Sequence, residues 1–443
     1  RYIHTCLSPW TNSVYSRDDI PILNYLDDDG TPVEPTYYAP VIPMVLVNGC
    51  QGIGTGFSTT VPCFNPLDVT GLIQAKIDKQ QSVYEEKIGN LTPWYRGFRG
   101  KIVPLNDSRK QYLTFGVYRL VNFKTIEIDE LPIGLWTEDY KEYLETLLFD
   151  AKPPSKAKSK TKTGGGKGEA AGAGPSMKQY LRSIENHSTE SRISFRLEFR
   201  PEVLRRLLKS GRDKEGVSLL ERELRLTSKI SLTNIHLFNS SRIIQKYDTV
   251  KDIVDEFYTT RLDLYRQRKE YQLRRLQYDL DLLSEKIRFI NGVVDETIVI
   301  HRQSRAQIDA TLESQKFRKF PSGRFNLEQW FKQQEEDYTP DDNSDEVPIT
   351  ADYNYLVSMP IYNLTSDKIT ELEKQLGERQ SELDRLKGLT LEQIWSVELD
   401  EFKNVYNRTM DAWTKENEKE YTAQLTTKGK AKTRKPRKVI KKK

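Results

Sequence analysis

The sequence predicts an α+β protein of several domains, in which a mixed α/β part precedes a long antiparallel coiled-coil arm with a helical tip. Three observations lead to this expectation. Residues 41–150 and 178–250 hold short apolar runs between Gly and Pro residues. Residues 251–300 and 361–388 each hold a heptad repeat. The 443-residue chain is long enough for about two to four domains.

The mixed part is predicted to contain strands and turns with occasional helices. Its apolar runs VIPMVLV (41–47) and TIEIDELPIGLW (125–136) are short and bounded by turn residues. Residues 152–176 are rich in Lys, Gly, Pro and Ser, so they are predicted to be a disordered insert. The insert contains GGGKG, but Gly168 follows Lys167 where a phosphate-binding loop has Ser or Thr. Nucleotide binding is therefore not expected there.

The arm is predicted from two heptad seams that pair with each other. Steps of three and four residues connect Leu273, Leu276, Leu280, Leu283, Ile287, Ile290 and Val294. The second seam consists of Ile369, Leu372, Leu376, Leu383 and Leu386, with Arg379 at one seam position. Residues 301–360 must then form the tip, where the acidic stretch Glu335 to Glu346 is predicted to be a solvated loop. The apolar stretch 353–361 is predicted to be buried or to form an interface.

Charge is distributed unevenly along the chain. Residues 428–443 hold ten Lys or Arg and no acid, and residues 152–178 hold seven Lys and one Glu. Since the total is +5, removing these +10 and +6 leaves −11 for the rest. Such basic segments favour contact with phosphates, and a nuclear-import signal or a solubilising tail would have the same composition. A closing helix over 389–426 and a basic disordered tail over 427–443 complete the predicted organisation.

Several classes of protein are disfavoured. Three cysteines without C-x-x-C spacing give no disulfide framework and no zinc ribbon. No apolar run is long enough to span a bilayer, so no membrane partner is expected. Asp279-Leu280-Asp281 resembles a metal-binding D-x-D pair, but it lies within the predicted heptad helix and is interpreted as a solvated face. No metal ligand is predicted in this chain.

Blocks of sequence along nearly the whole chain resemble the eukaryotic and viral type IIA DNA topoisomerases, in that family's order. They are RYI (1–3), VEPTYYAPVIPMVLVNGCQGIGTGFSTTVPCFNP (33–66), PWYRGFRGKI (93–102), ELPIGLWTEDYKEYLE (130–145), KYDTVKDIVDEFYTTRLDLYRQRKEY (246–271), YNYLVSMPIYNLT (353–365) and LEQIWSVELDEF (391–402). The resemblance implies that residues 1–40 end a winged-helix domain and that residues 41–250 form a tower domain. It also implies that the tip at 301–360 joins two chains as an exit gate, the C-gate.

The resemblance implies that Tyr2 is the nucleophile and Arg1 its catalytic partner. A phenol with a pKa near 10 is a poor nucleophile at neutral pH. A neighbouring guanidinium can favour the phenolate and stabilise charge on the phosphorus. Tyr2 is then expected to attack a DNA phosphodiester and to hold the 5′ end as a phosphotyrosine.

The resemblance also implies a DNA-bending site in NGCQGIGTGF (48–57). Ile53 is expected to insert between base steps, with Gly52 close to the minor groove. A second DNA-contacting stretch alternates polar and apolar residues like a half-buried strand. Its expected contacts are Arg225, Thr227, Ser228, Lys229, Ser231 and Asn234. Arg96, Arg99 and Lys101 are weaker candidates for the same role.

The expected activity is that of an ATP-dependent enzyme that cuts both strands of one duplex, passes a second duplex through the cut and reseals it, which relaxes and decatenates DNA. The family's Mg²⁺-binding and ATP-binding domains are not recognisable in the sequence, so this chain alone is expected to be inactive. Its expected partners are double-stranded DNA and a second copy, in a nucleus or in the factory or virion of a large DNA virus. Two alternatives stay open: a non-catalytic DNA-bending dimer, and a separate subunit completed by another chain.

Overall fold

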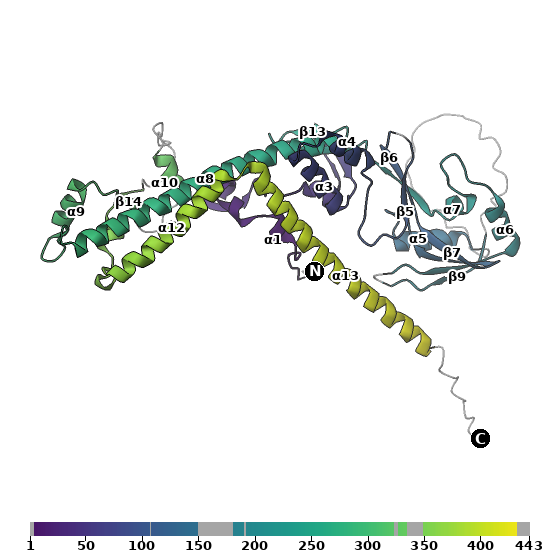
Figure 1. Cartoon of the computed structure of the whole chain (residues 1–443). Helices are drawn as coiled ribbons and strands as arrows, with labels where there is room; N and C mark the ends of the chain where they lie inside the picture. Colours follow the sequence, from purple (N-terminus) through teal and green to yellow (C-terminus); the bar gives the residue numbers. More distant parts are fainter. Residues whose placement is uncertain are drawn as a thin grey trace, which may run out of the picture. The chain divides into compact units, whose positions relative to one another are not determined.

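The computed structural model describes residues 4–106, 108–148, 180–189, 192–322, 327–334 and 349–431. The chain forms two compact units, labelled by element in Figure 1. One unit is Pro43–Phe257, and the other combines Arg1–Ile42 with Tyr258–Lys443. The predicted insert at 152–176 lies outside the described residues, as do Arg1, Tyr2 and Ile3.

The unit Pro43–Phe257 contains an antiparallel four-stranded sheet in the order β7-β8-β10-β9. Alternate residues of the central strands are buried, among them Ile126, Ile128, Phe195 and Leu197, and they pack with helix residues such as Tyr140. The strands are β7 (Val117–Asn122), β8 (Thr125–Glu130), β9 (Leu181–Asn186) and β10 (Phe195–Phe199). The helices in this core are α5 (Thr137–Thr146), α6 (Pro201–Lys209) and α7 (Leu219–Glu223).

A second, three-stranded sheet of the same unit has the order β11-β6-β5, and two separate hairpins join β3 with β4 and β12 with β13. The strands are β3 (Cys50–Gly54), β4 (Phe57–Val61), β5 (Lys101–Pro104), β6 (Gln111–Phe115), β11 (Thr227–Ser231), β12 (His236–Phe238) and β13 (Ile244–Lys246). Helix α3 (Pro66–Ile77) starts where the Asn65 side chain accepts a hydrogen bond from the Leu67 N–H at 3.0 Å. Helix α4 (Gln81–Asn90) follows.

The apolar run 41–47 was expected to belong to a part with strands, turns and occasional helices, and it leads into a helix. Met44–Asn48 form the short helix α2. Pro43 precedes the helix, and Gly49 ends it at φ 67°, a conformation that suits glycine. An apolar run of this length fits a strand or a helix turn equally well by its pattern. In the other apolar run, 125–136, the first six residues form strand β8 (Thr125–Glu130).

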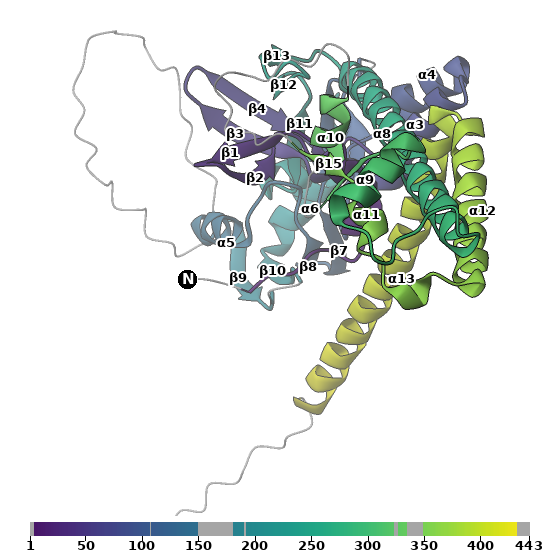
Figure 2. The same ribbon diagram turned by 90° about the vertical axis from the view of Figure 1, so that its left-hand side faces the viewer.

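The second unit is built around helix α12 (Ser366–Gly388) and the part of helix α8 (Val250–Val294) that starts at Tyr258. They lie side by side and run in opposite directions in Figures 1 and 2. Leu276 and Leu280 of α8 are buried with Leu383 of α12, and Leu273, Leu376 and Leu386 pack around them. Arg379, at one seam position, is exposed. Its guanidinium pairs with Glu382 on the same helix at 2.8 Å and also interacts electrostatically with Asp279 of α8.

The end of α8 and the residues between α8 and α12 in the sequence form a small core. It buries Phe289, Ile298, Ile308, Leu312, Phe317, Tyr353 and Leu356. The elements there are α9 (Arg305–Ser314), β14 (Phe320–Pro321), α10 (Leu327–Gln333), β15 (Ala351–Asp352), α11 (Asn354–Val357) and η2 (Ile361–Asn363). Ser304 and Gln307 cap α9 reciprocally. The acidic stretch Glu335 to Glu346 lies outside the described residues, which resume at residue 349.

The first described residues pack on the last helix, α13 (Leu391–Ala431). The ring centroid of Trp10 lies 5.9 Å from that of Phe402 and 5.9 Å from that of Tyr406. The elements of this segment are α1 (Thr11–Val14), η1 (Arg17–Ile22), β1 (Tyr25–Asp28) and β2 (Thr31–Pro35). The predicted closing helix continues past residue 426, and the rest of the predicted tail, 432–443, lies outside the described residues.

A buried ionic cluster connects η1, α8 and α13 within this unit. Arg261 donates to the Asp19 carboxylate at 2.8 Å, and Arg268 contacts both Asp19 at 3.4 Å and Glu398 at 2.8 Å. The Arg261 and Asp19 side chains are 0% and 1% exposed. Both Arg261 and Arg268 also lie over the ring of Tyr265, at 4.1 and 4.6 Å from its centroid. No pattern in the sequence predicted this cluster.

Candidate nucleic-acid interface

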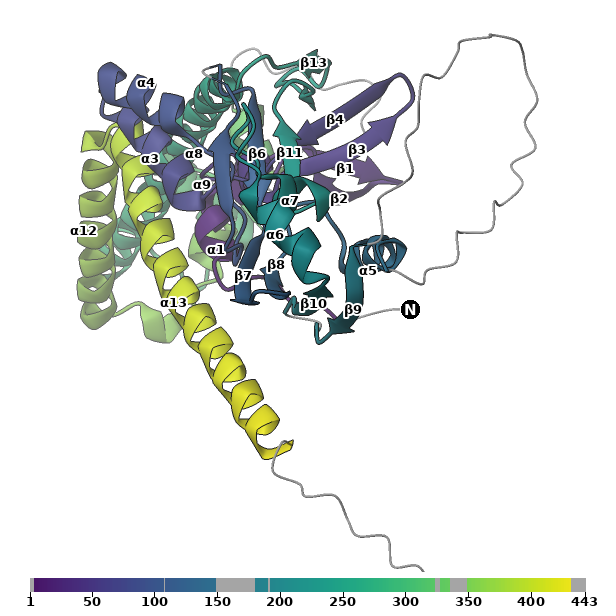
Figure 3. The same ribbon diagram turned by 90° about the vertical axis from the view of Figure 1, so that its right-hand side faces the viewer.

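The hairpin of β3 and β4 presents the predicted wedge residue. The two strands pair antiparallel, with Ile53 opposite Ser58 and Gly54 opposite Phe57, and a tight turn at Thr55-Gly56. The Ile53 side chain is 93% exposed. A large apolar side chain at that exposure, close to a hairpin turn, has no packing role within the described fold. The hairpin projects as a two-stranded ribbon in Figure 3.

The base of this hairpin is tightly packed around Gly49. A Cβ atom there would come 2.8 Å from the Val61 carbonyl oxygen and 2.9 Å from the Cys63 sulfur, so no side chain fits. The Cys63 thiol donates to the Asn48 carbonyl at 3.1 Å, and burial raises the pKa of this thiol. Gly52, by contrast, has no atom within 4 Å of an added Cβ. The described fold therefore does not require glycine at position 52, and only a close approach from outside the chain would.

A second segment braces the hairpin from the side of β4. The Thr60 N–H donates to the Asn234 carbonyl at 2.8 Å, and the Asn234 amide donates to the Ser58 hydroxyl at 2.9 Å. The His236 N–H donates to the Thr59 hydroxyl at 3.2 Å. Asn234 was expected to contact DNA, whereas its amide is engaged with Ser58 here. His236 was not singled out, because one histidine carries no pattern that sequence reasoning can use.

Strand β11 places its predicted contact residues on two faces. Ser228 and Ile230 share the inward face, where the Ser228 hydroxyl donates to the Ile133 carbonyl at 2.5 Å and contacts the Thr114 hydroxyl at 2.8 Å. Thr227, Lys229 and Ser231 alternate onto the other face, where Lys229 is exposed. The Lys229 ammonium pairs with Glu215 at 2.8 Å.

Arg225 precedes this strand and stacks on an aromatic ring. Its guanidinium carbon lies 3.9 Å from the centroid of Tyr143, and its backbone φ is 50°. Among the weaker candidates, Arg99 donates to the Asp129 carbonyl at 2.6 Å and lies 3.7 Å from the Glu130 carboxylate. This guanidinium is therefore held by the protein itself.

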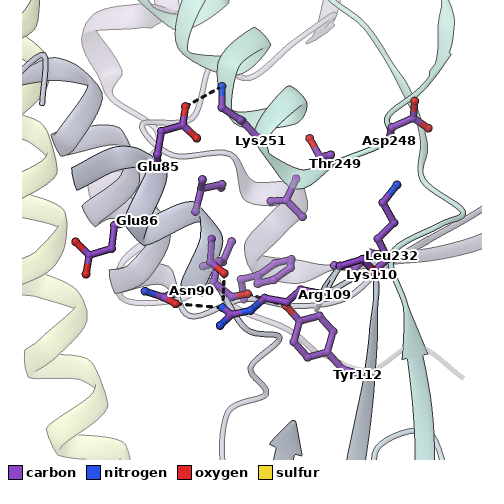
Figure 4. A pocket seen from close by; sticks show the side chains of 16 residues that line it. Glu85, Glu86, Asn90, Arg109, Lys110, Tyr112, Leu232, Asp248, Thr249 and Lys251 are labelled. Atoms are coloured by element: carbon purple, nitrogen blue, oxygen red, sulfur yellow. Dashed lines mark hydrogen bonds and ion pairs between the residues drawn. The ribbon is translucent and has the colours of Figure 1, made fainter. Parts of the chain in front are cut away.

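A pocket of about 610 Å³ lies in the same unit, lined by α4, by residues 108–110 before β6 and by the start of α8. Its lining includes apolar residues such as Phe64, Leu91 and Val250. Charged residues also line it, and Figure 4 labels Glu85, Arg109 and Lys251 among them. The Lys251 ammonium lies 3.5 Å from Glu85 and 3.1 Å from Asp255. None of the predicted DNA-contacting residues lines this pocket, and neither does the hairpin of β3 and β4.

Asp255 lies at the centre of a polar network beside the pocket. Burial by itself would raise the pKa of its carboxyl, but hydrogen bonds from Lys76, Tyr84 and Lys251 hold that pKa below its usual range. The Tyr84 hydroxyl donates to Asp255 at 2.7 Å. The network ties α3 and α4 to the first turns of α8.

The predicted nucleophile and its partner, Tyr2 and Arg1, lie outside the described residues, so the structure gives no geometry for them. Within the described ranges, no group of three His, Cys, Asp or Glu side chains could hold a metal ion. Asp279 and Asp281 were interpreted as a solvated helix face, but both are only partly exposed. Asp281 pairs with Arg318, and burial raises the pKa of Asp279. Among the helices of the described ranges, none is long and apolar enough to cross a membrane.

Comparison with known proteins gives a consistent set of similarities. Residues 1–400 match the family model for the A subunit of DNA gyrase and topoisomerase IV. The chain is 34% identical over 444 residues to DNA topoisomerase 2 of Acanthamoeba polyphaga mimivirus, covering 92% of this chain and 32% of that protein. It is 33% identical over 405 residues to DNA topoisomerase 2 of Plasmodium falciparum, covering 90% and 26%.

A solved structure agrees with these relatives. The fold is similar to the Plasmodium falciparum topoisomerase II DNA-binding, cleavage and re-ligation domain, with a TM-score of 0.71 and 30% identity. The similarity covers 94% of this chain and 51% of that one. The chain spans about a quarter to a third of the length of the curated relatives described above.

Proposed function

Because the chain belongs to the type IIA DNA topoisomerases, in the family of the gyrase and topoisomerase IV A subunits, we propose that it is the DNA-breaking and dimer-holding part of such an enzyme. The intact enzyme would cut both strands of one duplex, pass a second duplex through the break and reseal the first. The result is relaxation and decatenation of DNA. The likeness of nearly the whole chain to a DNA-binding, cleavage and re-ligation domain is the observation that supports this most.

The chemistry assigned to Tyr2 is a transesterification. Its phenolic oxygen attacks a DNA phosphorus, the bond from phosphorus to the 3′ oxygen breaks, and that oxygen takes up a proton as a free hydroxyl. The 5′ phosphate stays on Tyr2 as a phosphodiester, so the reverse reaction needs no energy source. Arg1 is assigned to stabilise charge on the phosphate during both steps.

Ile53 is assigned the role of a wedge that bends the cleaved duplex. Its exposure close to a hairpin turn suits insertion between base steps, a device that costs a few kcal/mol and is offset by contacts along the bent DNA. Gly52 would let the minor groove approach the backbone closely. Thr227, Lys229 and Ser231 would contact phosphates along the same duplex, with Arg225 beside them. Ser228 and Asn234 would support these contacts through the protein bonds that they already make.

The seam between α8 and α12 and the small core of α9 and α11 support the assignment of residues 251–388 as a coiled-coil arm with a C-gate tip. We propose that two chains form a homodimer through this tip. The described residues do not fit a Mg²⁺ site. Mg²⁺ and ATP are assigned to the intact enzyme, bound by domains outside this chain. The proposed location is the nucleus, or the factory or virion of a large DNA virus, in line with eukaryotic and mimivirus relatives.

Covalent capture of DNA tests the proposal. The intact enzyme is incubated with end-labelled duplex and denatured, and the DNA that stays attached to protein is measured. Tyr2→Phe is expected to abolish this attachment and to keep DNA binding, because only the phenolic oxygen is lost. Tyr362→Phe, which alters an exposed tyrosine, serves as the matched control and is expected to behave like wild type. Equal capture by Tyr2→Phe and wild type would overturn the cleavage role and favour a non-catalytic DNA-bending dimer.

A second arrangement is open, because the matched family is one of separate subunits by its description. In it, the chain is one polypeptide of an enzyme completed by another chain. The mass and N-terminal sequence of the native protein decide between the two arrangements. A native polypeptide that contains the Mg²⁺-binding and ATP-binding domains together with this chain would exclude the two-polypeptide arrangement.

A further inference from the structure

In the described structure, the hairpin of β3 and β4 that carries Ile53 is bonded to the rest of its unit along the outer edge of β4. Strand β3 pairs only with β4 in the described part of the chain, and every residue of β3 is exposed. An isolated two-stranded hairpin is marginally stable in water. A wedge on such a ribbon would bend back when it meets a stacked base step, unless the ribbon is held from another side. Among the described residues, chain from outside the hairpin bonds to the outer edge of β4, where Asn234 to His236 lie.

The His236 side chain makes the contact closest to the wedge. Its Nδ1 lies 2.9 Å from the Ser58 carbonyl oxygen. A carbonyl only accepts, so Nδ1 must carry the hydrogen and donate it. Ser58 is the residue directly opposite Ile53 in the hairpin register. The bond therefore fixes the backbone of the cross-strand partner of the wedge.

The ring of His236 also packs against the turn end of the hairpin. Its centroid lies 5.9 Å from that of Phe57, with the two ring planes 64° apart. Phe57 is opposite Gly54, one residue beyond Ile53. The imidazole thus contacts two consecutive residues of β4, one by a hydrogen bond and one by an edge-to-face ring contact. The Asn234 amide adds a bond to the Ser58 hydroxyl, so both the backbone and the side chain of Ser58 are held.

We propose that His236 is a positioning residue for DNA bending, which holds the β3–β4 hairpin at the angle at which Ile53 enters the duplex. The inference rests on the proposed function in one respect, the assignment of Ile53 as the wedge. His236 does not contact DNA in this role. Through its bond to Ser58, it connects the hairpin to the rest of the unit Pro43–Phe257, so that the hairpin does not bend away when Ile53 meets the DNA.

Three variants test the proposal in the full chain. His236→Ala removes both the bond and the ring. His236→Asn removes the ring but keeps a donor, because the Asn Nδ2 occupies the place of the His Nδ1 along the side chain. His187→Ala is the matched control, since His187 is an exposed histidine of the same unit whose ring contacts only Glu185 in the described structure.

The first readout is amide hydrogen exchange of residues 50–61, which reports on the hairpin without DNA. His236→Ala is expected to speed exchange by about three- to tenfold, the range that one lost hydrogen bond accounts for. His236→Asn is expected to stay within about twofold of wild type. Unchanged exchange in His236→Ala would overturn the proposal, and so would equal acceleration in both His236 variants, which would assign the effect to ring packing.

The second readout is the bent fraction of a duplex labelled at both ends with a dye pair, measured by energy transfer at saturating protein. His236→Ala is expected to lower the ratio of bent to straight DNA by about three- to tenfold, with rescue by His236→Asn. A bent fraction equal to wild type in His236→Ala would overturn the positioning role. If instead Ile53→Ala bends DNA like wild type while His236→Ala loosens the hairpin, the wedge assignment fails and the hold of His236 on the hairpin stands.

Discussion

At the scale of single residues, the most informative side chain is Ile53. Its exposure costs the folded chain stability, whereas its proposed role as a wedge requires that exposure. Burying an isoleucine stabilises a protein by roughly 1.5–3 kcal/mol relative to leaving it exposed. At 93% exposure Ile53 makes no such contribution to the described fold. Its stabilisation becomes available only when a ligand covers it, and an unstacked base step is a surface of the right kind.

Replacing Ile53 by Ala is accordingly expected to lower the bent fraction of a dye-labelled duplex by about tenfold or more, because the methyl group cannot fill an opened base step. Thermal stability should be unchanged. The matched control is Ile243→Ala, at an exposed isoleucine beside strand β13, and it is expected to bend DNA like wild type. Full bending by Ile53→Ala, or an equal loss in the control, would contradict the role assigned to Ile53.

The sequence led to Ile53 and not to the residues that hold it. Ile53 was reached through the resemblance carried by residues 33–66, and the structure places it on an exposed hairpin. His236 was missed because the fold alone brings it beside Ser58, 178 residues away in sequence. Ser228 was expected to contact DNA together with Thr227 and Lys229, whereas strand alternation turns its hydroxyl toward the Ile133 carbonyl.

At the scale of elements, the long heptad pattern indicated which residues pack between the helices, whereas the short apolar run 41–47 did not distinguish a strand from a helix. The heptad steps through Leu273, Leu276 and Leu280 span several helix turns, and those residues pack with the second seam. Val294, at the end of the same seam, is 50% exposed because the helix ends there. The run at 41–47 covers fewer residues than two helix turns, so Pro43 and Gly49 decided its conformation.

The junction of α3, α4 and α8 gives a prediction for pH. The hydrogen bonds to Asp255 lower its pKa in the folded state, so the carboxylate stabilises the fold when it is ionised. This contribution is fully present above the unfolded pKa, near 3.9, and is lost as the pH falls through the lower folded pKa. As the pH is lowered below about 4, the urea concentration at the unfolding midpoint is therefore expected to decrease more steeply for wild type than for Asp255→Asn.

The control for Asp255→Asn is a substitution of a nearby acidic residue that has no such hydrogen-bond network. Asp248→Asn is suitable, because its carboxylate is highly exposed and pairs with Lys246 at 3.4 Å. Its midpoint is expected to follow the wild-type pH profile. Parallel profiles for wild type and Asp255→Asn between pH values of about 2 and 5 would show that Asp255 does not contribute through its charge.

At the scale of the whole molecule, the buried ionic cluster joins segments that are far apart in the chain. Asp19 lies near the start, Arg261 and Arg268 lie on α8, and Glu398 lies on α13. A buried guanidinium that loses its partner stays buried and uncompensated, which costs about 3–5 kcal/mol. Within the unit formed by residues 1–42 and 258–443, the Asp19 carboxylate is therefore one anchor of the first segment, beside the packing of Trp10 on α13.

Asp19→Asn is expected to lower the stability of this unit by about 3 kcal/mol, measured as a shift of its urea transition. Asp18→Asn, at the exposed neighbouring residue, is the control and should change stability by less than about 0.5 kcal/mol. In Asp19→Asn, Arg268 keeps Glu398 at 2.8 Å and Arg261 keeps it at 3.6 Å. The loss should therefore be smaller than in Arg261→Ala, which also removes the contact of this guanidinium with the ring of Tyr265. An Asp19→Asn transition that coincides with wild type would show that the cluster does not hold the segment.

The four-stranded sheet of the other unit has a consequence for how the gene can be altered. Strands β7 and β8 precede residue 148, strands β9 and β10 follow residue 180, and the Leu181 N–H donates to the Leu147 carbonyl at 3.0 Å. The residues on either side of 149–179 thus lie next to each other. The strand pair β7–β8 and the strand pair β9–β10 are joined by hydrogen bonds between β8 and β10, independently of the chain that connects them. A fluorescent protein spliced in at this point, or two co-expressed polypeptides divided here, should still assemble the same core.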